Sequence, residues 1–277
     1  MDLAEISKLC KDIEKKSGKG SIFTVGKNAS LQIPRWQTRI EALDNIIGGG
    51  MPKGRIIEIF GPESSGKTSL MYWLMSLHSL GLYIPIEGTY DEERALQMGV
   101  QKGKMIVHRA NYGEEALNDV LKFAKAGIPI IGLDSVPACQ PKDDITKIEK
   151  DAENEVRIGG VARLFSKMLP SIVRTCEESG TTLILINQVR DNMNAMLFGD
   201  KDTTPGGRAI KFYSSLRIKV ARRAWIEIPN KNPNISANTE KVGLIMKAKV
   251  QKSKVSNPFA ECEMPFFFDR GFVGYDD

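Results

Sequence analysis

A Gly-rich stretch that contains a lysine and a threonine carries the clearest chemical signal in the sequence. Residues 61–68 read GPESSGKT and fit the phosphate-loop pattern G-x-x-x-x-G-K-[ST] at every position. In such a loop, backbone N–H groups converge on a polyphosphate at a helix N-terminus, where the helix dipole favours negative charge. Lys67 is expected to reach the β and γ phosphates, and the Thr68 hydroxyl to ligate Mg²⁺. The pattern therefore predicts a site for a nucleoside triphosphate with magnesium.

The residues on either side of this loop decide whether it can hold a phosphate. Residues 55–60 (RIIEIF) are mostly apolar and β-branched, which predicts a buried strand, and Leu70, Trp73 and Leu74 recur at helical spacing. A strand–loop–helix context is what phosphate binding requires, and it disfavours a plain Gly-rich turn with a solvated lysine. The expected nucleotide-binding residues are Gly61, Pro62, Glu63, Ser64, Ser65, Gly66, Lys67, Thr68, Ser69, Asp91 and Phe268.

Acidic residues close two further apolar runs. Residues 128–134 (IPIIGLD) end in Asp134, and residues 81–87 (GLYIPIE) end in Glu87. Because the carboxyl ends of parallel strands meet at one edge of an open sheet, both carboxylates are expected to flank the γ-phosphate. Asp134 would hold Mg²⁺, although strands also end in Asp at ordinary turns, and Glu87 would polarise the attacking water. The acids of residues 91–94 (DEER) are rival bases, but their position favours the first turn of a helix.

A third apolar run ends in amides and leads into a polar segment. Residues 181–190 (TTLILINQVR) present Gln188, which could hydrogen-bond the γ-phosphate and report its loss. The next residues, 191–212, are polar and Gly-rich, and residues 141–160 form a second segment of this kind. Long segments without structure are uncommon unless they are functional, so both are predicted to be mobile binding loops rather than plain surface loops. The basic residues at the second segment are Arg190, Lys201, Arg208 and Lys211.

The elements that must position these residues follow from the apolar pattern. A helix over residues 3–16 places its apolar side chains on one side, and a Gly-punctuated link leads from it into a short strand. So small an element must dock on its own core or on another subunit. From Ile33 onward, apolar strands alternate with helices, and the last runs are strands without helices between them. The predicted class is α/β: a mostly parallel sheet flanked by helices, with antiparallel strands at the C-terminal side.

Length and composition exclude several classes of protein. The 277 residues are 42% hydrophobic, which is enough for a large core, and the formal net charge of +5 permits a polyanionic partner. No apolar run approaches the length of a membrane span, and the charged start excludes a signal peptide, so we expect a soluble cytoplasmic protein without a membrane partner. The four cysteines are far apart, which favours free thiols over disulfides or a zinc site.

Taken together, the motifs resemble the RecA family of bacterial DNA strand-exchange recombinases. GPESSGKT is similar to the family's phosphate loop, and INQVR, MLFG and TTPGGRAIKFYSSLRIKV are similar to its second DNA-binding loop and the strand beyond it. IEKKSGKGSIFTVG is similar to the N-terminal element that packs on a neighbouring subunit, and KVQKSKVSNPF to the segment that carries two lysines across the subunit interface. The resemblance extends from about Ile13 to Tyr275.

This resemblance implies roles for individual residues. Glu87 would be the water-activating base, Gln188 the γ-phosphate sensor, and Lys252 and Lys254 would act on the ATP of the adjacent protomer, with Lys67 as a further catalytic residue. The spacing of Lys252 and Lys254 independently places both ammonium groups on one face of a strand, which would otherwise be taken as a solvated basic face. Phe212 would lie at the subunit interface. The implied DNA-binding residues are Ile158, Gly159, Arg163, Arg190, Met193, Gly206, Gly207 and Arg208.

The sequence also departs from the family pattern. Residues 143–155 are more acidic than the family's first DNA loop, and the second loop is one residue longer. Pro170 replaces a basic residue, and Arg94 replaces an aromatic residue that stacks on adenine. The chain ends at VGYDD, so the family's separate C-terminal domain is expected to be absent, as in a compact or phage-encoded member. The expected organisation is an oligomerisation element at 1–30 and an ATPase core at 31–277, with DNA loops at about 141–160 and 189–210.

The function that the resemblance implies is a DNA-dependent ATPase that uses ATP and Mg²⁺. It would form helical filaments on single-stranded DNA and drive homologous pairing with duplex DNA and strand exchange, in the cytosol of a bacterium or a phage-infected cell. A single-strand-binding or loader protein is a further candidate partner. Two alternatives stay open: a ring-forming RecA-like helicase or motor, and a non-hydrolysing recombinase paralogue that regulates a partner. A small-molecule P-loop kinase is disfavoured, because no Arg-rich segment resembling a lid is evident.

Overall fold

The chain divides into two compact units, which we describe separately in a computed structural model. The structure describes residues 3–18, 22, 33–88, 90–150, 159–191, 202–230 and 239–273. The first unit, residues 1–34, contains α1 (Leu3–Ser17), which agrees with the helix predicted over residues 3–16. None of the residues of α1 is buried, and Leu3 and Leu9 are 82% and 60% exposed. The short strand expected after this helix lies outside the described residues.

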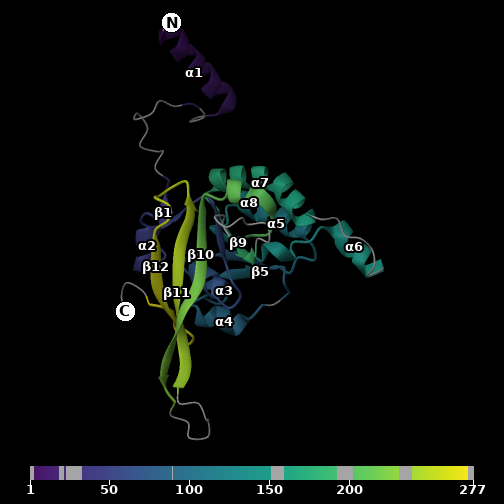
Figure 1. Cartoon of the computed structure of the whole chain (residues 1–277). Helices are drawn as coiled ribbons and strands as arrows, with labels where there is room; N and C mark the ends of the chain where they lie inside the picture. The colour runs from purple at the N-terminus through teal and green to yellow at the C-terminus, as the bar shows by residue number, and fades with distance from the viewer. Residues whose placement is uncertain are drawn as a thin grey trace. The chain divides into compact units, whose positions relative to one another are not determined.

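The second unit, residues 35–277, is built on a sheet of nine strands in the order β13-β12-β11-β10-β3-β7-β6-β4-β5 (Figure 1). The strands from β10 to β5 in this order are all parallel to their neighbours, whereas β10, β11, β12 and β13 pair antiparallel. The predicted α/β class is therefore confirmed. The nine strands are β3 (Ile56–Gly61), β4 (Gly81–Pro85), β5 (Met105–Val107), β6 (Ile130–Asp134), β7 (Thr182–Gln188), β10 (Leu216–Pro229), β11 (Thr239–Ser253), β12 (Glu261–Phe267) and β13 (Gly271–Phe272).

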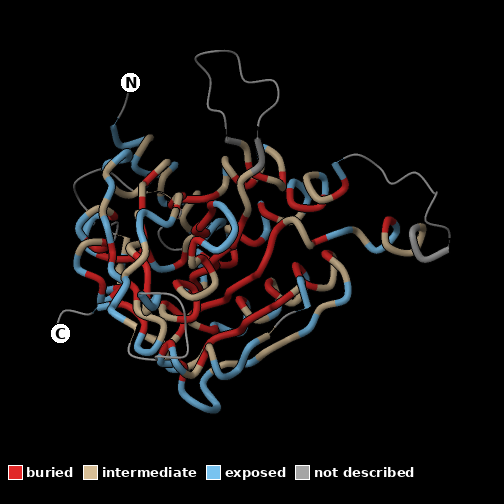
Figure 2. The backbone as a smooth tube through the Cα atoms, turned by 60° about the horizontal axis from the view of Figure 1, so that its bottom comes forward, coloured by how far each residue is buried: buried red, intermediate tan, exposed pale blue. Residues whose placement is uncertain are grey.

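Side chains of the central strands alternate between two cores, as the pleat requires. On β3, Ile57 and Ile59 belong to the same core as Leu70 and Leu74 of α3, so this helix covers one face. Ile56 faces the other core, which is built from α5 and α7. Buried residues accordingly concentrate along the central strands (Figure 2). The principal helices are α2 (Glu41–Ile46), α3 (Lys67–Ser76), α4 (Glu92–Gln97), α5 (Gly113–Lys125), α6 (Lys142–Lys150), α7 (Gly160–Ser179) and α8 (Gly207–Tyr213).

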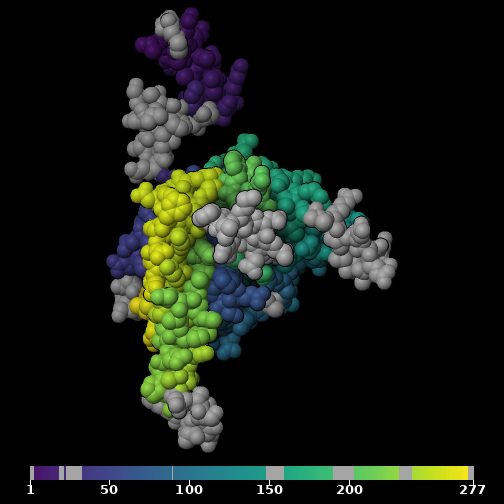
Figure 3. Space-filling view, in the orientation of Figure 1, coloured from purple at the N-terminus to yellow at the C-terminus, as the bar shows by residue number. Residues whose placement is uncertain are grey.

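Strands β10 and β11 extend beyond the rest of the sheet. They pair with each other from Leu216 to Pro229, but β10 pairs with β3 only as far as Lys219. Because β11 also pairs with β12 from Gly243 to Lys249, only residues 227–229 of β10 and 239–241 of β11 form a two-stranded ribbon, which stands out from the core unit (Figure 3). The apolar runs predicted only the sheet-bound parts of these strands, because the ribbon is rich in charged residues.

Both segments predicted as loops contain regular structure. Residues 142–150 form α6, and the second segment contains β8 (Arg190–Asp191) paired with β9 (Asp202–Thr203), followed by α8. The interpretation as structureless loops was therefore wrong for these residues, whose helices and strands are too short to show a clear pattern in the sequence. The strands β1 (Arg35–Trp36) and β2 (Met51–Pro52), together with β13 and α2, were also not predicted, because they are short.

Two further predictions concern the molecule as a whole. All four cysteines are free thiols, and Cys139 and Cys176 are buried. In the part of the chain that the structure describes, no helix combines the length and the apolar character needed to cross a lipid bilayer.

Candidate active site

The phosphate loop joins the carboxyl end of β3 to the first residue of α3, Lys67. Two of its glycines are required by the backbone. Gly66 has a left-handed φ of 85°, and a Cβ on Gly61 would lie 1.9 Å from the carbonyl oxygen of Val220. Only glycine allows the loop to adopt this conformation so close to β10. The loop therefore has the strand–loop–helix context that the sequence predicted.

Lys67 lies inside the loop. Its ammonium donates hydrogen bonds to the backbone carbonyls of Gly61, at 3.0 Å, and Pro62, at 2.6 Å. Burial lowers the pKa of Lys67, while the nearby carboxylates of Asp134, Glu87 and Glu63 act in the opposite direction. A buried cation beside these acids is positioned to neutralise an anionic ligand.

Asp134 and Thr68 form a pair of oxygen donors at the start of α3. The Thr68 hydroxyl donates to Asp134 Oδ2 at 2.7 Å, and the hydroxyl of Tyr83 on β4 donates to the same oxygen at 3.3 Å. Burial raises the pKa of Asp134, although the hydrogen bond from Thr68 lowers it. Burial beside Asp134 also raises the pKa of Tyr83, so its hydroxyl remains a donor at neutral pH. A hydroxyl and a carboxylate are the hard oxygen ligands that Mg²⁺ prefers, and the pair therefore fits this ion.

Glu87 and Gln188 come together from two different strands. Glu87 lies in the turn after β4 rather than within the strand, and its Oε1 accepts hydrogen bonds from the Ser135 hydroxyl and from Gln188 Nε2, the latter at 3.4 Å. Gln188 is also the register partner of Gly61 at the start of the phosphate loop. The carboxyl ends of β3, β4, β6 and β7 thus converge on one place, as the sequence predicted. Ser135 and Tyr83 were not predicted, because a lone hydroxyl beside a strand end carries no pattern of its own.

A pocket of about 390 Å³ opens next to these residues, between α3 and α4. Asp91, one of its lining residues, caps α4 by accepting a hydrogen bond from the backbone N–H of Arg94 at 2.9 Å, as the helix-start interpretation predicted. Arg94 also lines the pocket, packs on the ring of Phe268 and bonds the Phe268 carbonyl at 2.8 Å. Phe268 therefore contacts Arg94 through both its ring and its backbone carbonyl. The Ser69 hydroxyl lies 3.4 Å from the Arg94 guanidinium.

The N-termini of α7 and α8 line one hollow of about 230 Å³, away from the pocket beside α4. Gly159 and Gly206 precede these helices with left-handed φ values of 78° and 87°. A Cβ on Gly207, the first residue of α8, would lie 2.8 Å from Ala162 Cβ, so the two helices approach each other closely. Two helix N-termini that share a hollow offer backbone N–H groups and dipoles to an anion.

The other predicted DNA-binding residues are distributed around this hollow or lie outside the described residues. Arg163 and Arg208 are exposed on α7 and α8. Arg163 also lines a larger hollow of about 630 Å³ between α6 and α7, which does not include the phosphate loop. The backbone of Arg190 belongs to β8, whereas Ile158 and Met193 lie outside the described residues.

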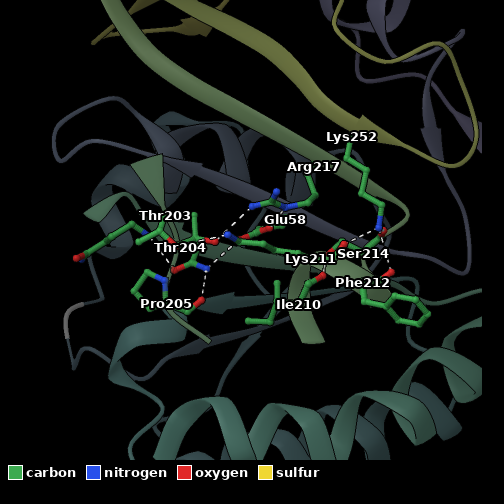
Figure 4. Close-up of polar contacts among 12 residues, drawn as sticks. Glu58, Thr203, Thr204, Pro205, Ile210, Lys211, Phe212, Ser214, Arg217 and Lys252 are labelled. Carbon is green, nitrogen blue, oxygen red and sulfur yellow. Dashed lines mark hydrogen bonds and ion pairs between the residues drawn. The ribbon is translucent and has the colours of Figure 1, made fainter. Parts of the chain in front are cut away.

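A buried polar network connects the strands β3, β7 and β10 with the segment that precedes α8 (Figure 4). Glu58 on β3 has no exposed surface and forms a short ion pair with Arg217 on β10. The Asn187 amide donates to Glu58 at 2.8 Å and to the carbonyl of Pro205 at 3.0 Å, while Arg217 donates to the Thr204 hydroxyl at 3.3 Å. The network holds residues 204–205 on the end of the sheet.

Lys252 and Lys254 both contact the C-terminal end of α8. The Lys252 ammonium donates to the carbonyls of Lys211, Phe212 and Ser214 (Figure 4). Burial lowers the pKa of Lys252, and the charges of Lys254 and Arg217 act in the same direction. The Lys254 ammonium lies 5.2 Å from the ring centroid of Phe212, which is 66% exposed. Lys254 follows the end of β11, so the two lysines share a neighbour rather than a regular strand face.

The sheet order and the phosphate loop define a P-loop fold of the RecA type. A model of the RecA N-terminal domain family matches residues 4–273, and the chain belongs to the RecA family. It is 36% identical to protein RecA of Mycoplasma mycoides, over 96% of this chain and 75% of the relative. It is 37% identical to protein RecA of Thermus aquaticus, over 94% of this chain and 75% of the relative.

A solved structure supports the fold independently. The structure described as the RadB recombinase superposes with a TM-score of 0.61 at 18% identity, over 85% of this chain and 97% of that chain. At this identity the likeness concerns the fold alone. The family resemblance inferred from the motifs is confirmed.

Proposed function

We propose that this protein is an ATP-dependent recombinase that hydrolyses ATP when bound to DNA. The observation that carries the proposal is the convergence of Asp134, Glu87 and Gln188, from three strand ends, with Thr68 at the start of α3, beside the phosphate loop. Family membership supports it, since the relatives named above are RecA proteins.

Each residue of the candidate site would have a separate role in ATP hydrolysis. The loop amides and Lys67 would bind the phosphates, and Thr68 and Asp134 would hold Mg²⁺, which neutralises charge on the phosphate oxygens when it is bound. Glu87, held by Ser135 and Gln188, would accept a proton from the attacking water. Gln188 would exchange its bond to Glu87 for one to the γ-phosphate, and would thereby sense the nucleotide. Arg94, backed by Phe268, would present its planar guanidinium to the base.

DNA would be bound through its phosphates at the hollow between α7 and α8. The two helix N-termini supply sequence-independent donors there, which suits a protein that must accept any sequence. Exposed Arg163 and Arg208 add charge near the hollow, and Arg190, Ile158 and Met193 would complete the DNA loops. The buried network from Asn187 to Pro205 would couple the nucleotide sensor to the second DNA loop.

Self-association into a helical filament would complete the site. Lys252 and Lys254 would reach the ATP of the neighbouring protomer and stabilise developing charge in trans, and exposed Phe212 would lie in the interface. Residues 1–30 would dock on the neighbouring core of residues 31–277. Homologous duplex DNA would be the second substrate, and a single-strand-binding or loader protein a further partner.

ATP hydrolysis by the full chain, with and without single-stranded DNA, tests this proposal. We expect DNA to stimulate turnover and filaments to appear by negative-stain electron microscopy. Lys252→Ala should abolish turnover while the protein still binds a fluorescent ATP analogue, because Lys252 is assigned to the neighbour's nucleotide. Lys249→Ala, on the same strand, is the matched control and should keep activity.

Two results would contradict the proposal. If single-stranded DNA does not change the rate of ATP hydrolysis, the protein is not a recombinase. If closed rings form in place of filaments, the protein is better described as a ring-forming motor. Full turnover by Lys252→Ala would contradict only the proposal that the active site is shared between two protomers. The melting temperature of each variant separates loss of fold from loss of function.

A further inference from the structure

Three ligand-type side chains converge on the side of the core unit formed by β5 and α5. His108 follows the end of β5, and Glu115 and Asp119 lie one turn apart on α5. One donor atom from each residue falls within 4.8 Å of the other two. The spacing i, i+4 puts both carboxylates on the same helix face, opposite the imidazole. Among the residues that the structure describes, no other group of histidines, cysteines and acids meets this condition.

Each carboxylate is held by a donor outside the group. The backbone N–H and the amide of Asn111 bond Glu115 Oε2 at 2.9 and 3.1 Å. Lys122 bonds Asp119 Oδ1 at 2.8 Å. The second oxygen of each acid then faces His108 Nε2, with Asp119 Oδ2 at 2.9 Å and Glu115 Oε1 at 3.8 Å. Outer donors that fix the orientation of inner oxygens are typical of metal sites.

The imidazole nitrogen is enclosed but not hydrogen-bonded. His108 Nε2 has almost no accessible surface, and no described residue satisfies it with hydrogen-bond geometry. Asp119 Oδ2 is close enough, but it lies off the direction in which the ring nitrogen would donate. The three side chains are 31%, 26% and 15% exposed, in the order His108, Glu115, Asp119. His108 Nε2 is therefore enclosed beside two carboxylate oxygens without a hydrogen-bond partner among the described residues.

We propose that His108, Glu115 and Asp119 bind a divalent transition-metal ion, with Zn²⁺ as the best match. One imidazole nitrogen and two carboxylate oxygens are zinc ligands, and a water would take the remaining position. Mg²⁺ and Ca²⁺ fit less well, because they take oxygen ligands only. The site is separate from the nucleotide site and does not depend on the proposed recombinase function. The competing explanation is a surface ion pair between protonated His108 and the acids.

Calorimetric titration of the full chain with ZnCl₂ tests the site, in the absence of nucleotide and with excess Mg²⁺ to occupy Asp134. We expect one saturable equivalent, a rise in melting temperature, and visible d–d absorption when Co²⁺ replaces Zn²⁺. His108→Gln and Asp119→Asn should each weaken zinc binding by at least about tenfold, and Asn111→Ala, which removes only an outer donor, by about tenfold.

Controls separate this site from other zinc ligands. The double variant Cys10→Ser/Cys262→Ser removes the two less buried thiols and should bind zinc as the wild type does. Glu178→Gln removes an exposed acid on α7 and should also have no effect. Unchanged affinity in both His108→Gln and Asp119→Asn, or no saturable binding at all, would overturn the proposal. If His108→Gln or Asp119→Asn does not melt cooperatively without zinc, that variant is not folded. The zinc affinity of the other variant and the Co²⁺ spectrum of the wild type then test the proposal.

Discussion

Glu58 is the most deeply buried charge in the described part of the sheet, and its partner Arg217 is nearly as enclosed. Their side chains are 0% and 10% exposed, and Arg217 also lies over the ring of Phe60. A buried ion pair contributes little relative to apolar residues, but removal of one partner leaves an uncompensated charge. Replacing either Glu58 or Arg217 alone should therefore destabilise the folded chain.

Glu58→Gln should lower the free energy of unfolding by about 3–5 kcal/mol, because it leaves Arg217 buried without its counter-charge. Urea unfolding measures this change. The matched control is Glu178→Gln, whose partner Arg174 is 82% exposed, and this variant should lose less than about 1 kcal/mol. Glu58→Gln/Arg217→Met should recover much of the loss. Equal effects of Glu58→Gln and Glu178→Gln would contradict this account.

His78 gives the folded chain a dependence on pH. It follows α3 and packs edge-on against Trp36, with ring centroids 4.4 Å apart. Burial lowers the pKa of His78 from 6.5 to about 4, and the charge of Lys53 acts in the same direction. Between these values the unfolded chain binds a proton that the folded chain does not, so the free energy of unfolding falls as pH falls from about 6.5 to about 4.

His78→Gln should flatten this part of the pH profile, because the titrating group is gone. Urea unfolding at a series of pH values measures the slope for wild type and variant. His108→Gln replaces the other of the two histidines and should leave the His78 contribution in place. A slope in His78→Gln that equals that of the wild type would assign the acid sensitivity to other groups.

The residues that lie together at the candidate site were largely predictable, whereas those that support them were not. The signals for these residues are local in sequence, because each belongs to a motif or lies at or just after the end of a strand: Lys67, Thr68, Asp134, Glu87 and Gln188. The contact between Glu58 and Arg217 joins residues 159 positions apart. An acid inside an apolar strand carries no sign of its distant partner. His108, Glu115 and Asp119 were missed for the same reason, since their convergence depends on how α5 packs beside β5.

At the scale of elements, α7 contains an unusual residue. Its 20 residues run from Gly160 to Ser179 with Pro170 inside the helix. Proline has no N–H to donate to the carbonyl four residues earlier, and its ring crowds that carbonyl. Pro170 is exposed, so its side chain adds little packing in compensation.

Pro170→Ala should raise the free energy of unfolding by about 1–2 kcal/mol. The gain from a complete helix is about 3 kcal/mol at most, and the greater freedom of the unfolded chain removes part of it. Thermal and urea unfolding both measure the change in the free energy of unfolding. Ser171→Ala, at the exposed neighbouring position, should change stability by no more than about 0.5 kcal/mol. A less stable Pro170→Ala would mean that the helix geometry that Pro170 imposes is required for packing.

The sequence predicted the elements whose apolar pattern was long or simple. The strands β3, β6 and β7 are buried over nearly their whole length, so they appear as continuous apolar runs. Helix α6 was interpreted as a loop, because charged residues dominate its sequence, although Asp144 is buried in the structure. The ribbon of β10 and β11 escaped detection since it buries neither face fully.

At the scale of the whole molecule, α1 is an amphipathic helix whose apolar side is not buried by the described residues. Leu9 is 60% exposed, and no residue of the helix is buried. We therefore expect Leu9→Asp to leave the free energy of unfolding of the single chain unchanged within about 0.5 kcal/mol. In contrast, Leu9→Asp should prevent the protomers from assembling on single-stranded DNA in the presence of ATP. Sedimentation velocity measures this assembly.

Ser7→Asp introduces the same charge on the same helix at an exposed polar position, and should assemble as the wild type does. Assembly of Leu9→Asp to the wild-type extent would exclude α1 from the contact between protomers. A lower melting temperature for Leu9→Asp would instead show that α1 packs on its own core.

The ion pair of Glu58 and Arg217 also bears on how the chain finds its fold. These residues are register partners on parallel strands, and Asn187 joins the same network from a third strand. Such long-range pairings are slow to form, because large loops must close first. A slip of one residue would turn Arg217 to the opposite face and leave Glu58 buried alone. Misaligned forms of the sheet are therefore penalised during folding by a charge, whereas apolar strands alone would tolerate them.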